Sequence, residues 1–348
     1  MRALQLPDWK SDPKLVEVDQ PEPGPGEVVV KIGGSGACHS DLHLMHDFEG
    51  EELPWSPPFT LGHENAGWVD TVGDGVSAVE VGQAVAVYGP WGCGRCPRCR
   101  VGVENYCENP EAAPIPGGGG GLGLDGGMAE FMLVPHERLL VPLPDGLEPA
   151  VAAPLSDAGL TPYHAIRRSL PRLLPNTHTV AIGLGGLGHV GVQMLSAMSA
   201  TTIIAVDLKE EALAGAEADG AHVTILSDDG AAEEIMTATG GKGADLVLDF
   251  VGADPTIGLA MSVVRPMGEV TVVGIGGGTF EWAFMGVPYE SSLANTYWGT
   301  RPELIEVLNL GARGLIRPRT TTFSLDDAVG AYEQLDAGDL DGRAVIVP

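Results

Sequence analysis

The stretch Val180-Ala181-Ile182-Gly183-Leu184-Gly185-Gly186-Leu187-Gly188 decides the fold of half of this chain. A short apolar run comes first, and a glycine-rich turn of the pattern G-x-G-x-x-G then opens an apolar segment that continues to about Ser199. In such a turn the first glycine makes the bend, the second lets backbone approach a pyrophosphate, and the third packs helix against strand. The dipole of the following helix favours phosphate. We expect a dinucleotide to contact Gly183, Gly185, Gly186, Leu187 and Gly188.

An aspartate ends the next expected strand. The run Thr202–Val206 is followed by Asp207, 19 residues after Gly188, where a carboxylate accepts hydrogen bonds from ribose hydroxyls. A 2′-phosphate would meet a like charge there, so Asp207 favours NAD over NADP, although Lys209 lies nearby. The alternative interpretation is a plain turn between strand and helix, with a surface aspartate.

Strands alternate with helices beyond Asp157, which predicts parallel βαβ units. The expected elements of this part are strands at 180–182, 202–206, 222–226, 246–250 and 270–273, with helices at 188–199, 210–218 and 231–239. Residues 1 to about 154 are instead β-rich, with short apolar runs such as 27–32, 66–72 and 84–88 broken by Gly and Pro, and with a loop at 117–121. We expect a small irregular barrel or sandwich there, and a final strand at 344–347.

Four of the five cysteines form the pattern C-x₂-C-x₂-C-x₇-C. Thiolates at this spacing close a tetrahedron around Zn²⁺, and a closed site of this kind is structural because no position remains open for substrate. Unrelated buried cysteines and an iron–sulfur cluster are the alternatives. The four residues are Cys93, Cys96, Cys99 and Cys107.

The fifth cysteine, Cys38, and His63 are candidate ligands of a second, catalytic zinc, which takes three protein ligands and keeps one position open. The third ligand cannot be a cysteine, because the other four are already assigned. Glu64 and an acid elsewhere in the chain remain candidates.

The charge excludes several partners. Acidic residues number 47 and basic residues 19, which gives a formal net charge of −28. Nucleic acid and anionic membranes would repel such a surface. We found no apolar run long enough to span a membrane and no signal peptide, so we expect a cytoplasmic protein. With only five lysines, the acidic excess suggests a source that lives in high salt.

In these motifs and their order, the chain resembles the zinc-dependent medium-chain alcohol dehydrogenases, and in particular bacterial NAD-dependent secondary alcohol dehydrogenases. The resemblance covers essentially the whole chain. It rests on the cysteine cluster, the glycine loop with Asp207, and the segments 38–43, 62–64, 88–93, 156–161 and 297–300.

The resemblance implies a GroES-like β-barrel catalytic domain with an inserted Rossmann domain. We expect residues 1–155 and 295–348 to form the catalytic domain, with a structural zinc lobe at about 91–110, and 156–294 to form the NAD domain. Two zinc ions per chain, NAD and a homodimer or homotetramer follow from the same resemblance.

The resemblance also implies roles for single residues. Asp157 would be the third catalytic zinc ligand, where many members of the family have cysteine. Ser40 and His43 would carry the proton, through the cofactor ribose in the family, and Asp41 would orient His63. Glu64 would approach the metal during ligand exchange.

Further contacts are implied by position in the family or by residue type. His39, Thr161, Leu187 and Arg343 would contact the cofactor, Arg343 near the pyrophosphate. Trp298, Tyr297 and Trp55 would form the substrate wall.

The expected reaction is reversible oxidation of a primary or secondary alcohol to an aldehyde or ketone, with hydride transfer to NAD. The alternatives are a polyol, sugar or amino-alcohol dehydrogenase of the same superfamily, and a zinc- and NAD-binding protein without turnover. A zinc-free quinone reductase is disfavoured by Cys38, His63 and the cysteine cluster.

Overall fold

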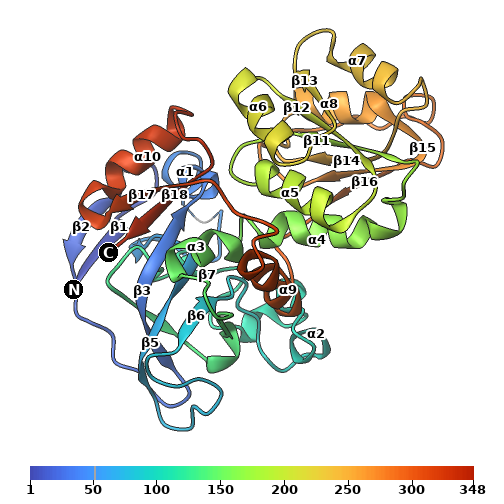
Figure 1. Ribbon diagram of the computed structural model, residues 1–348. Coiled ribbons are helices and arrows are strands. Elements are labelled where there is room, and N and C mark those ends of the chain that lie inside the picture. Colours follow the sequence, from blue (N-terminus) through green and yellow to red (C-terminus); the bar gives the residue numbers. More distant parts are fainter. Residues whose placement is uncertain (51) are drawn as a thin grey trace. The chain divides into compact units, whose positions relative to one another are not determined.

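The structure is a computed structural model that describes residues 1–50 and 52–348, and it divides into two compact units (Figure 1). The first unit comprises Met1–Leu160, Trp298–Gly314 and Pro318–Pro348. The second comprises Thr161–Tyr297 and Leu315–Arg317. The C-terminal third of the chain therefore contributes to both units.

The first unit is built on mostly antiparallel sheets. The largest sheet has the strand order β10-β6-β5-β3-β18-β17, and β9 also pairs with β3; a second sheet has the order β2-β1-β4, and β7 pairs with β8. The strands are β1 (Arg2–Leu6), β2 (Lys14–Glu17), β3 (Val28–Ala37), β4 (Phe59–Thr60), β5 (Glu64–Val72), β6 (Ala84–Val87), β7 (Gly119–Gly120), β8 (Gly123–Leu124), β9 (Phe131–Val134), β10 (Leu140–Pro142), β17 (Thr320–Ser324) and β18 (Arg343–Val347).

The helices of this unit are short, and several lie at strand ends. They are α1 (His39–His46), α2 (Pro97–Arg100), α3 (Pro149–Ala152), α9 (Arg301–Ala312) and α10 (Ala328–Asp336), with 3-10 turns η1 (Glu104–Tyr106), η2 (Pro110–Ala112), η3 (Glu137–Leu139), η4 (Ala153–Ser156) and η6 (Leu325–Asp327).

The C-terminal strand joins the first unit at its centre. β18 pairs antiparallel with β3, with Ala344 opposite Ala37 and Val345 opposite Gly36. A buried apolar cluster on this side includes Leu4, Phe59 and Ile346. The start of β18 and the end of β3 are thus adjacent, which is where the site described below lies.

The second unit is a six-stranded, fully parallel sheet in the order β13-β12-β11-β14-β15-β16. Its elements are β11 (His178–Ile182), β12 (Thr202–Asp207), β13 (Val223–Leu226), β14 (Ala244–Asp249), β15 (Val264–Val272), β16 (Ser292–Asn295), α4 (Leu160–Ser169), η5 (Leu170–Arg172), α5 (Gly188–Met198), α6 (Glu210–Ala218), α7 (Ala231–Ala238) and α8 (Asp254–Val263). The predicted parallel sheet is confirmed.

The strand order also explains where the helices lie. From β11, the strands β12 and β13 follow one another toward one edge of the sheet. From β14, the strands β15 and β16 follow one another toward the opposite edge. Because parallel crossovers are right-handed, α5 and α6 must cover one face, and α7 and α8 the other. Helix α5 contacts α6, and α7 contacts α8, as expected if the two helices of each pair share a face. The order reverses between β11 and β14, which is where such sheets bind ligands, at the carboxyl ends of their strands.

The structure adds elements that the sequence did not predict, and one expected loop contains a strand. The β-rich half contains the helix α1, which is only eight residues long and buries Leu42, Leu44 and Met45 without a regular apolar period. The expected loop at 117–121 includes the short strand β7, paired with β8. Elements α8 and β16 were not expected at all. Within the described part of the chain, no helix has the length and apolar character needed to cross a bilayer.

Candidate active site and metal centres

The end of β3 and the start of α1 place the first candidate ligand. Cys38 is the N-cap residue of α1, with extended backbone geometry. Its backbone N–H donates to Asp41 Oδ2 at 3.0 Å, so the first helical turn is tied back to its cap. The Cys38 side chain is thereby held at a rigid junction between strand and helix.

His63 and Glu64 stand at the start of β5, and both are buried. Gly62 precedes them with φ of +95°, and a Cβ there would lie 2.8 Å from the Met128 backbone nitrogen. Gly36 on β3 faces Glu64 so closely that any side chain at position 36 would collide with the carboxylate. Glycine is therefore required at both positions to seat His63 and Glu64.

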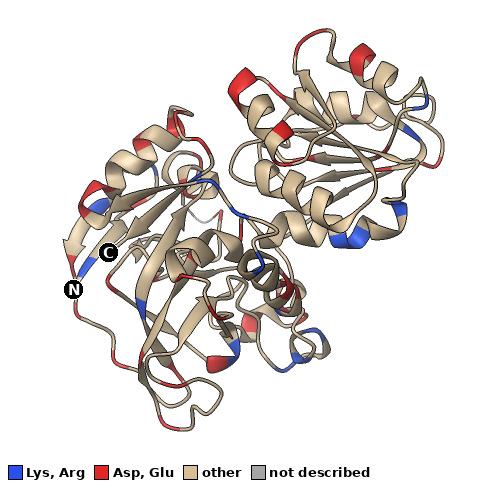
Figure 2. Cartoon of the chain, viewed as in Figure 1, with Lys and Arg blue, Asp and Glu red and all other residues tan. Residues whose placement is uncertain are grey.

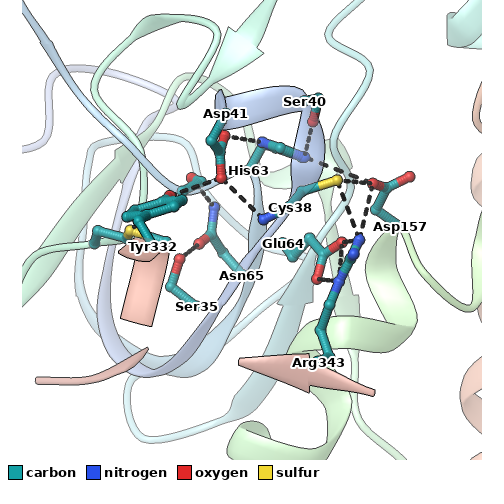
Figure 3. A network of polar contacts seen from close by, with 12 residues as sticks. Ser35, Cys38, Ser40, Asp41, His63, Glu64, Asn65, Asp157, Tyr332 and Arg343 are labelled. Atoms are coloured by element: carbon teal, nitrogen blue, oxygen red, sulfur yellow. Dashed lines mark hydrogen bonds and ion pairs between the residues drawn. The ribbon is translucent and has the colours of Figure 1, made fainter. Parts of the chain in front are cut away.

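Asp157 follows η4 and completes a cluster with Cys38, His63 and Glu64 (Figure 3). One ligand atom from each residue lies within 4.8 Å of the others. Asp157 Oδ2 is 3.6 Å from His63 Nε2 and 3.9 Å from Cys38 Sγ. Residues that are far apart in the sequence thus present sulfur, nitrogen and oxygen donors to one point.

Several ionisable groups are buried together in this cluster. Burial raises the pKa of Glu64 to about 7, against the opposing charge of Arg343. Burial by itself lowers the pKa of His63, but the charge of Asp41 and hydrogen bonding with Asp157 raise it well above its ordinary value. Without a metal, Arg343 and a protonated His63 balance the buried acids; a bound Zn²⁺ would replace the His63 proton, because a ligand imidazole is neutral. The donor set of thiol, imidazole and carboxylate fits a catalytic Zn²⁺ with three protein ligands.

The four-cysteine lobe forms a second cluster within 4.8 Å. Cys96 Sγ is 3.3 Å from Cys99 Sγ, which is far longer than a disulfide bond, and all four are free thiols. Backbone N–H groups of Cys99 and Glu108 lower the pKa of Cys96 to about 6, whereas burial raises the pKa of Cys99 and of Cys107. Four thiolates side by side require a cation, and Zn²⁺ fits a closed four-sulfur site.

A buried ion pair supports the start of this lobe. Glu104 Oε2 accepts from Gly92 N–H at 3.0 Å, and Arg138 donates to Glu104 at 3.2 Å and to Gly92 O at 2.7 Å. Both the backbone N–H and the backbone carbonyl of Gly92, the residue before Cys93, are thus hydrogen-bonded. Sequence reasoning did not single out Glu104 or Arg138, because charged residues are common and only the fold brings these two together.

The glycine loop in the second unit has the geometry expected of it. Gly183 has φ of +83°, and its N–H donates to Val206 O on the adjacent strand. Among residues 1–50 and 52–348, no heavy atom beyond the neighbours of Gly185 lies within 4 Å of where its Cβ would be. Asp207 Oδ2 accepts from Leu184 N–H at 2.6 Å, so the acid is tied to the loop. This open glycine turn beside a carboxylate fits a dinucleotide with a free ribose hydroxyl pair.

Comparison with known proteins agrees with this arrangement. The alcohol dehydrogenase GroES-like domain family matches residues 24–145, and the zinc-binding dehydrogenase family matches residues 186–313. The chain is 36% identical over 358 residues to an NAD-dependent alcohol dehydrogenase of Sulfurisphaera tokodaii, and the match covers 100% of both. The chain belongs to the NAD-dependent, zinc-containing medium-chain alcohol dehydrogenases.

Two further relatives are informative. The crystal structure of the alcohol dehydrogenase from Aeropyrum pernix has a TM-score of 0.91 and 34% identity, with 100% of both chains covered. A D-arabinose 1-dehydrogenase (NADP(+)) of Saccharolobus solfataricus is 36% identical over 352 residues, covering 100% of this chain and 97% of the relative. These matches confirm the GroES-like and Rossmann folds and the use of NAD, and the two donor clusters fit two zinc ions. None of the comparisons supports the expectation of a high-salt source.

For an alcohol dehydrogenase, the positions of the expected proton-carrying residues matter. Ser40 and His43 lie on α1, and Ser40 Oγ is 3.2 Å from His63 Nε2. His43 is paired with Asp47, the C-cap residue of α1, and its side chain is 33% exposed. Exposed His39 begins the helix. The structure thus places Ser40 at the buried cluster and His43 toward solvent.

Arg343 is 1% exposed, so it is not a surface charge. It starts β18, where its Nε is 3.1 Å from both Glu64 carboxylate oxygens and its Nη2 is 3.2 Å from Cys38 Sγ. The structure therefore places Arg343 against the zinc ligands. Thr161 is buried on α4. The contacts of Thr161 and Arg343 with the cofactor stay predictions.

The three aromatic residues expected at the substrate wall have different surroundings. Trp298 is buried, its ring centroid is 5.6 Å from that of His63, and its Nε1 donates to Ser156 O at 2.9 Å. Trp55 packs edge-on against Phe59 at 5.5 Å and contacts the core of the first unit. Tyr297 is 44% exposed and ends the main segment of the second unit. Only Trp298 is described beside a zinc ligand.

Proposed function

We propose that this dehydrogenase oxidises secondary and primary alcohols to ketones and aldehydes, and runs the reverse reduction, with NAD. The observation that carries the proposal is the convergence of Cys38, His63 and Asp157 at one buried point. Such a set holds zinc and leaves a fourth position for substrate oxygen. When bound, zinc acts as a Lewis acid on that oxygen, and NAD exchanges hydride with the carbon.

The remaining site residues handle protons and water. Ser40, beside His63, would take the alcohol proton while giving its own hydroxyl proton to the cofactor ribose, and the partly exposed His43 would pass a proton from the ribose to solvent. Asp41 is fully buried with Oδ1 at 3.1 Å from His63 Nδ1, so it orients the imidazole. Trp298 covers one side of His63 and excludes water. Glu64, paired with Arg343, balances charge next to the ligands.

The test is a panel of small secondary and primary alcohols, polyols and aldoses, assayed with NAD⁺ and with NADP⁺ at the NADH absorbance. We expect the highest kcat/KM for an apolar secondary alcohol with NAD⁺. Binding of two zinc ions and NAD without turnover of any substrate would favour the alternative of a binding protein.

A second candidate is oxidation of a sugar. It is favoured by the D-arabinose 1-dehydrogenase relative and by a D-arabinose dehydrogenase structure from Sulfolobus solfataricus, with a TM-score of 0.84 and 31% identity. The match covers 97% of the first and 99% of the second. A higher kcat/KM for aldoses than for secondary alcohols in the same panel would decide for this candidate.

We propose that residues 156–294 form the cofactor domain, residues 1–155 with 295–348 form the catalytic domain, and about 91–110 form the structural zinc lobe. Leu187 caps α5 and follows Gly186, so both stand where phosphates meet the helix N-terminus. Thr161, His39 and Arg343 are the further cofactor contacts in this proposal. A cytoplasmic location is part of the same proposal.

The Asp207→Ser variant tests cofactor recognition. Loss of hydrogen bonds to a charged group costs about 1.5–3 kcal/mol, so KM for NAD⁺ should rise about tenfold or more. KM for NADP⁺ should fall, because the like charge is gone. Asp228→Ser is the matched control, since Asp228 caps a turn after the neighbouring strand by accepting from Gly230 N–H at 2.7 Å. If the ratio of KM for NAD⁺ to KM for NADP⁺ were unchanged, Asp207 would not select between the two cofactors.

We also propose that a second copy of the chain pairs along β16. This strand is one of the two edges of the parallel sheet, and exposed apolar side chains lie on it and on the segment before it: Trp282, Phe284, Met285, Tyr289 and Leu293. An unprotected edge beside an apolar patch is typical of an interface.

The Leu293→Lys variant tests this interface. We expect sedimentation to show a dimer or tetramer for the unmodified chain and a smaller species for the variant, because a lysine would be buried without a partner. Leu174→Lys, at an exposed leucine in the same unit, should leave the mass unchanged. A monomeric unmodified chain at micromolar concentration would contradict the proposal.

A further inference from the structure

A tyrosine near the C-terminus reaches the catalytic cluster. Tyr332 lies on α10, which packs against α1, and it is 3% exposed. Its hydroxyl donates to Asp41 Oδ2 at 2.7 Å, across 291 positions of sequence (Figure 3). Asp41 itself is fully buried, so this bond has no competition from solvent.

The two oxygens of Asp41 have separate tasks. Oδ2 receives two donors, the Tyr332 hydroxyl and the Cys38 backbone N–H at 3.0 Å. Oδ1 lies 3.1 Å from His63 Nδ1. Two hydrogen bonds to Oδ2 from fixed donors set the plane of the Asp41 carboxylate. The orientation of that plane determines where Oδ1 lies relative to the His63 imidazole.

We propose that Tyr332 is a positioning residue for the catalytic zinc, because its hydroxyl fixes the carboxylate that orients His63. The inference rests on the proposed role of His63 as a ligand. Residues one step behind a metal ligand set the direction of its lone pair, and their loss costs about 10–100-fold in metal affinity or activity.

The contact of the Tyr332 hydroxyl with Met128 explains its position less well than the contact with Asp41. Met128 Sδ lies 3.2 Å from the Tyr332 oxygen, but a thioether is a weak acceptor, whereas a carboxylate is a strong one. Burial and the charge of Asp41 raise the pKa of Tyr332 well above its ordinary value, so the group stays protonated and serves as a donor.

The test compares zinc release from Tyr332→Phe and the unmodified holoenzyme, each with two bound zinc ions, in excess chelator with a metal-sensitive dye. The phase that belongs to the catalytic zinc is identified by its absence in Asp157→Ala. We expect this phase to be about tenfold faster in Tyr332→Phe, and the structural-zinc phase to be unchanged. Release is measured below the unfolding transition of every variant.

Two matched variants separate positioning from general stability. Tyr88→Phe removes another buried hydroxyl, which donates to Gly299 O at 2.7 Å, and should leave the catalytic-zinc phase unchanged at a similar loss of thermal stability. Met128→Leu removes only the sulfur contact of Tyr332 and should also leave that phase unchanged. In an Asp41→Asn background, Tyr332→Phe should add little further acceleration, because both changes act on one bond.

The inference would be overturned if Tyr332→Phe released the catalytic zinc at the rate of the unmodified chain, or if both zinc phases were accelerated equally. It would also be overturned if the accelerations caused by Tyr332→Phe and Asp41→Asn were fully additive. These outcomes differ from failure of the proposed function. If the unmodified chain bound only one zinc ion, or retained two in Asp157→Ala, the ligand assignment itself would be wrong.

Discussion

The Asp157→Ala variant is expected to bind one zinc ion per chain and to lose alcohol oxidation by on the order of 10³-fold or more in kcat/KM. Asp157 is a partly exposed carboxylate with Oδ2 at 3.6 Å from His63 Nε2, and it is the proposed third ligand. Removing it leaves two ligands, which do not hold a catalytic zinc. Lewis-acid stabilisation worth several kcal/mol is then lost, and each 1.36 kcal/mol is tenfold in rate.

Metal analysis and steady-state kinetics on the same preparation measure both effects. Asp157→Cys is the matched control, because a thiolate is also a zinc ligand and conserves the single negative charge. It should keep two zinc ions and most of the activity. Two zinc ions in Asp157→Ala would show that Glu64 or another group is the third ligand.

The Cys93→Ser variant is expected to lose the structural zinc and to unfold at a lower temperature. Binding energy at a closed site is folding energy, because the unfolded chain does not preform the four-sulfur cluster. A loss of about 3 kcal/mol corresponds to a fall in Tm of about 5 °C or more for a unit of this size. The folded fraction should keep its catalytic zinc and its KM for alcohol.

Cys38→Ser is the crossed control, since Cys38 belongs to the other cluster. It should lose the catalytic zinc and the activity while its Tm falls less than that of Cys93→Ser. Calorimetry with zinc analysis compares the two directly. An unchanged Tm in Cys93→Ser would mean that the cysteine lobe contributes no stability through metal.

Local patterns predicted the parallel sheet and the cysteine lobe because their information is contiguous. The turn Gly183–Gly188 is followed by an apolar helix, and the structure has α5 beginning at Gly188. Cys93, Cys96 and Cys99 are separated by two residues each, so one short turn brings them together. No distant partner is needed to predict either feature.

The elements that the sequence did not predict depend on distant partners. Helix α1 is too short to show an apolar period, and it is held by Cys38 N–H on Asp41 and by packing against α10. Strand β16 is a short edge strand that exists through its pairing with β15. Neither segment has a strong secondary-structure propensity of its own, so tertiary contacts determine that α1 and β16 form.

The net charge of −28 follows from the sequence alone, and Figure 2 shows Asp and Glu distributed over both units. Likewise, the glycine turn between an apolar strand and an apolar helix, with Asp207 after the next strand, predicted a dinucleotide site, and the spacing of four cysteines predicted a structural metal site. Spacing works there because ligands that are near in sequence stay near in any compact fold.

Only the tertiary structure decided the arrangement around the catalytic cluster. It brought Asp157 to Cys38 and His63, buried Arg343 against Glu64, and joined Tyr332 to Asp41. These residues come from the two ends and the middle of the chain. Their meeting depends on β18 pairing with β3 and on α10 packing against α1, and such long-range pairing has no local signature in the sequence.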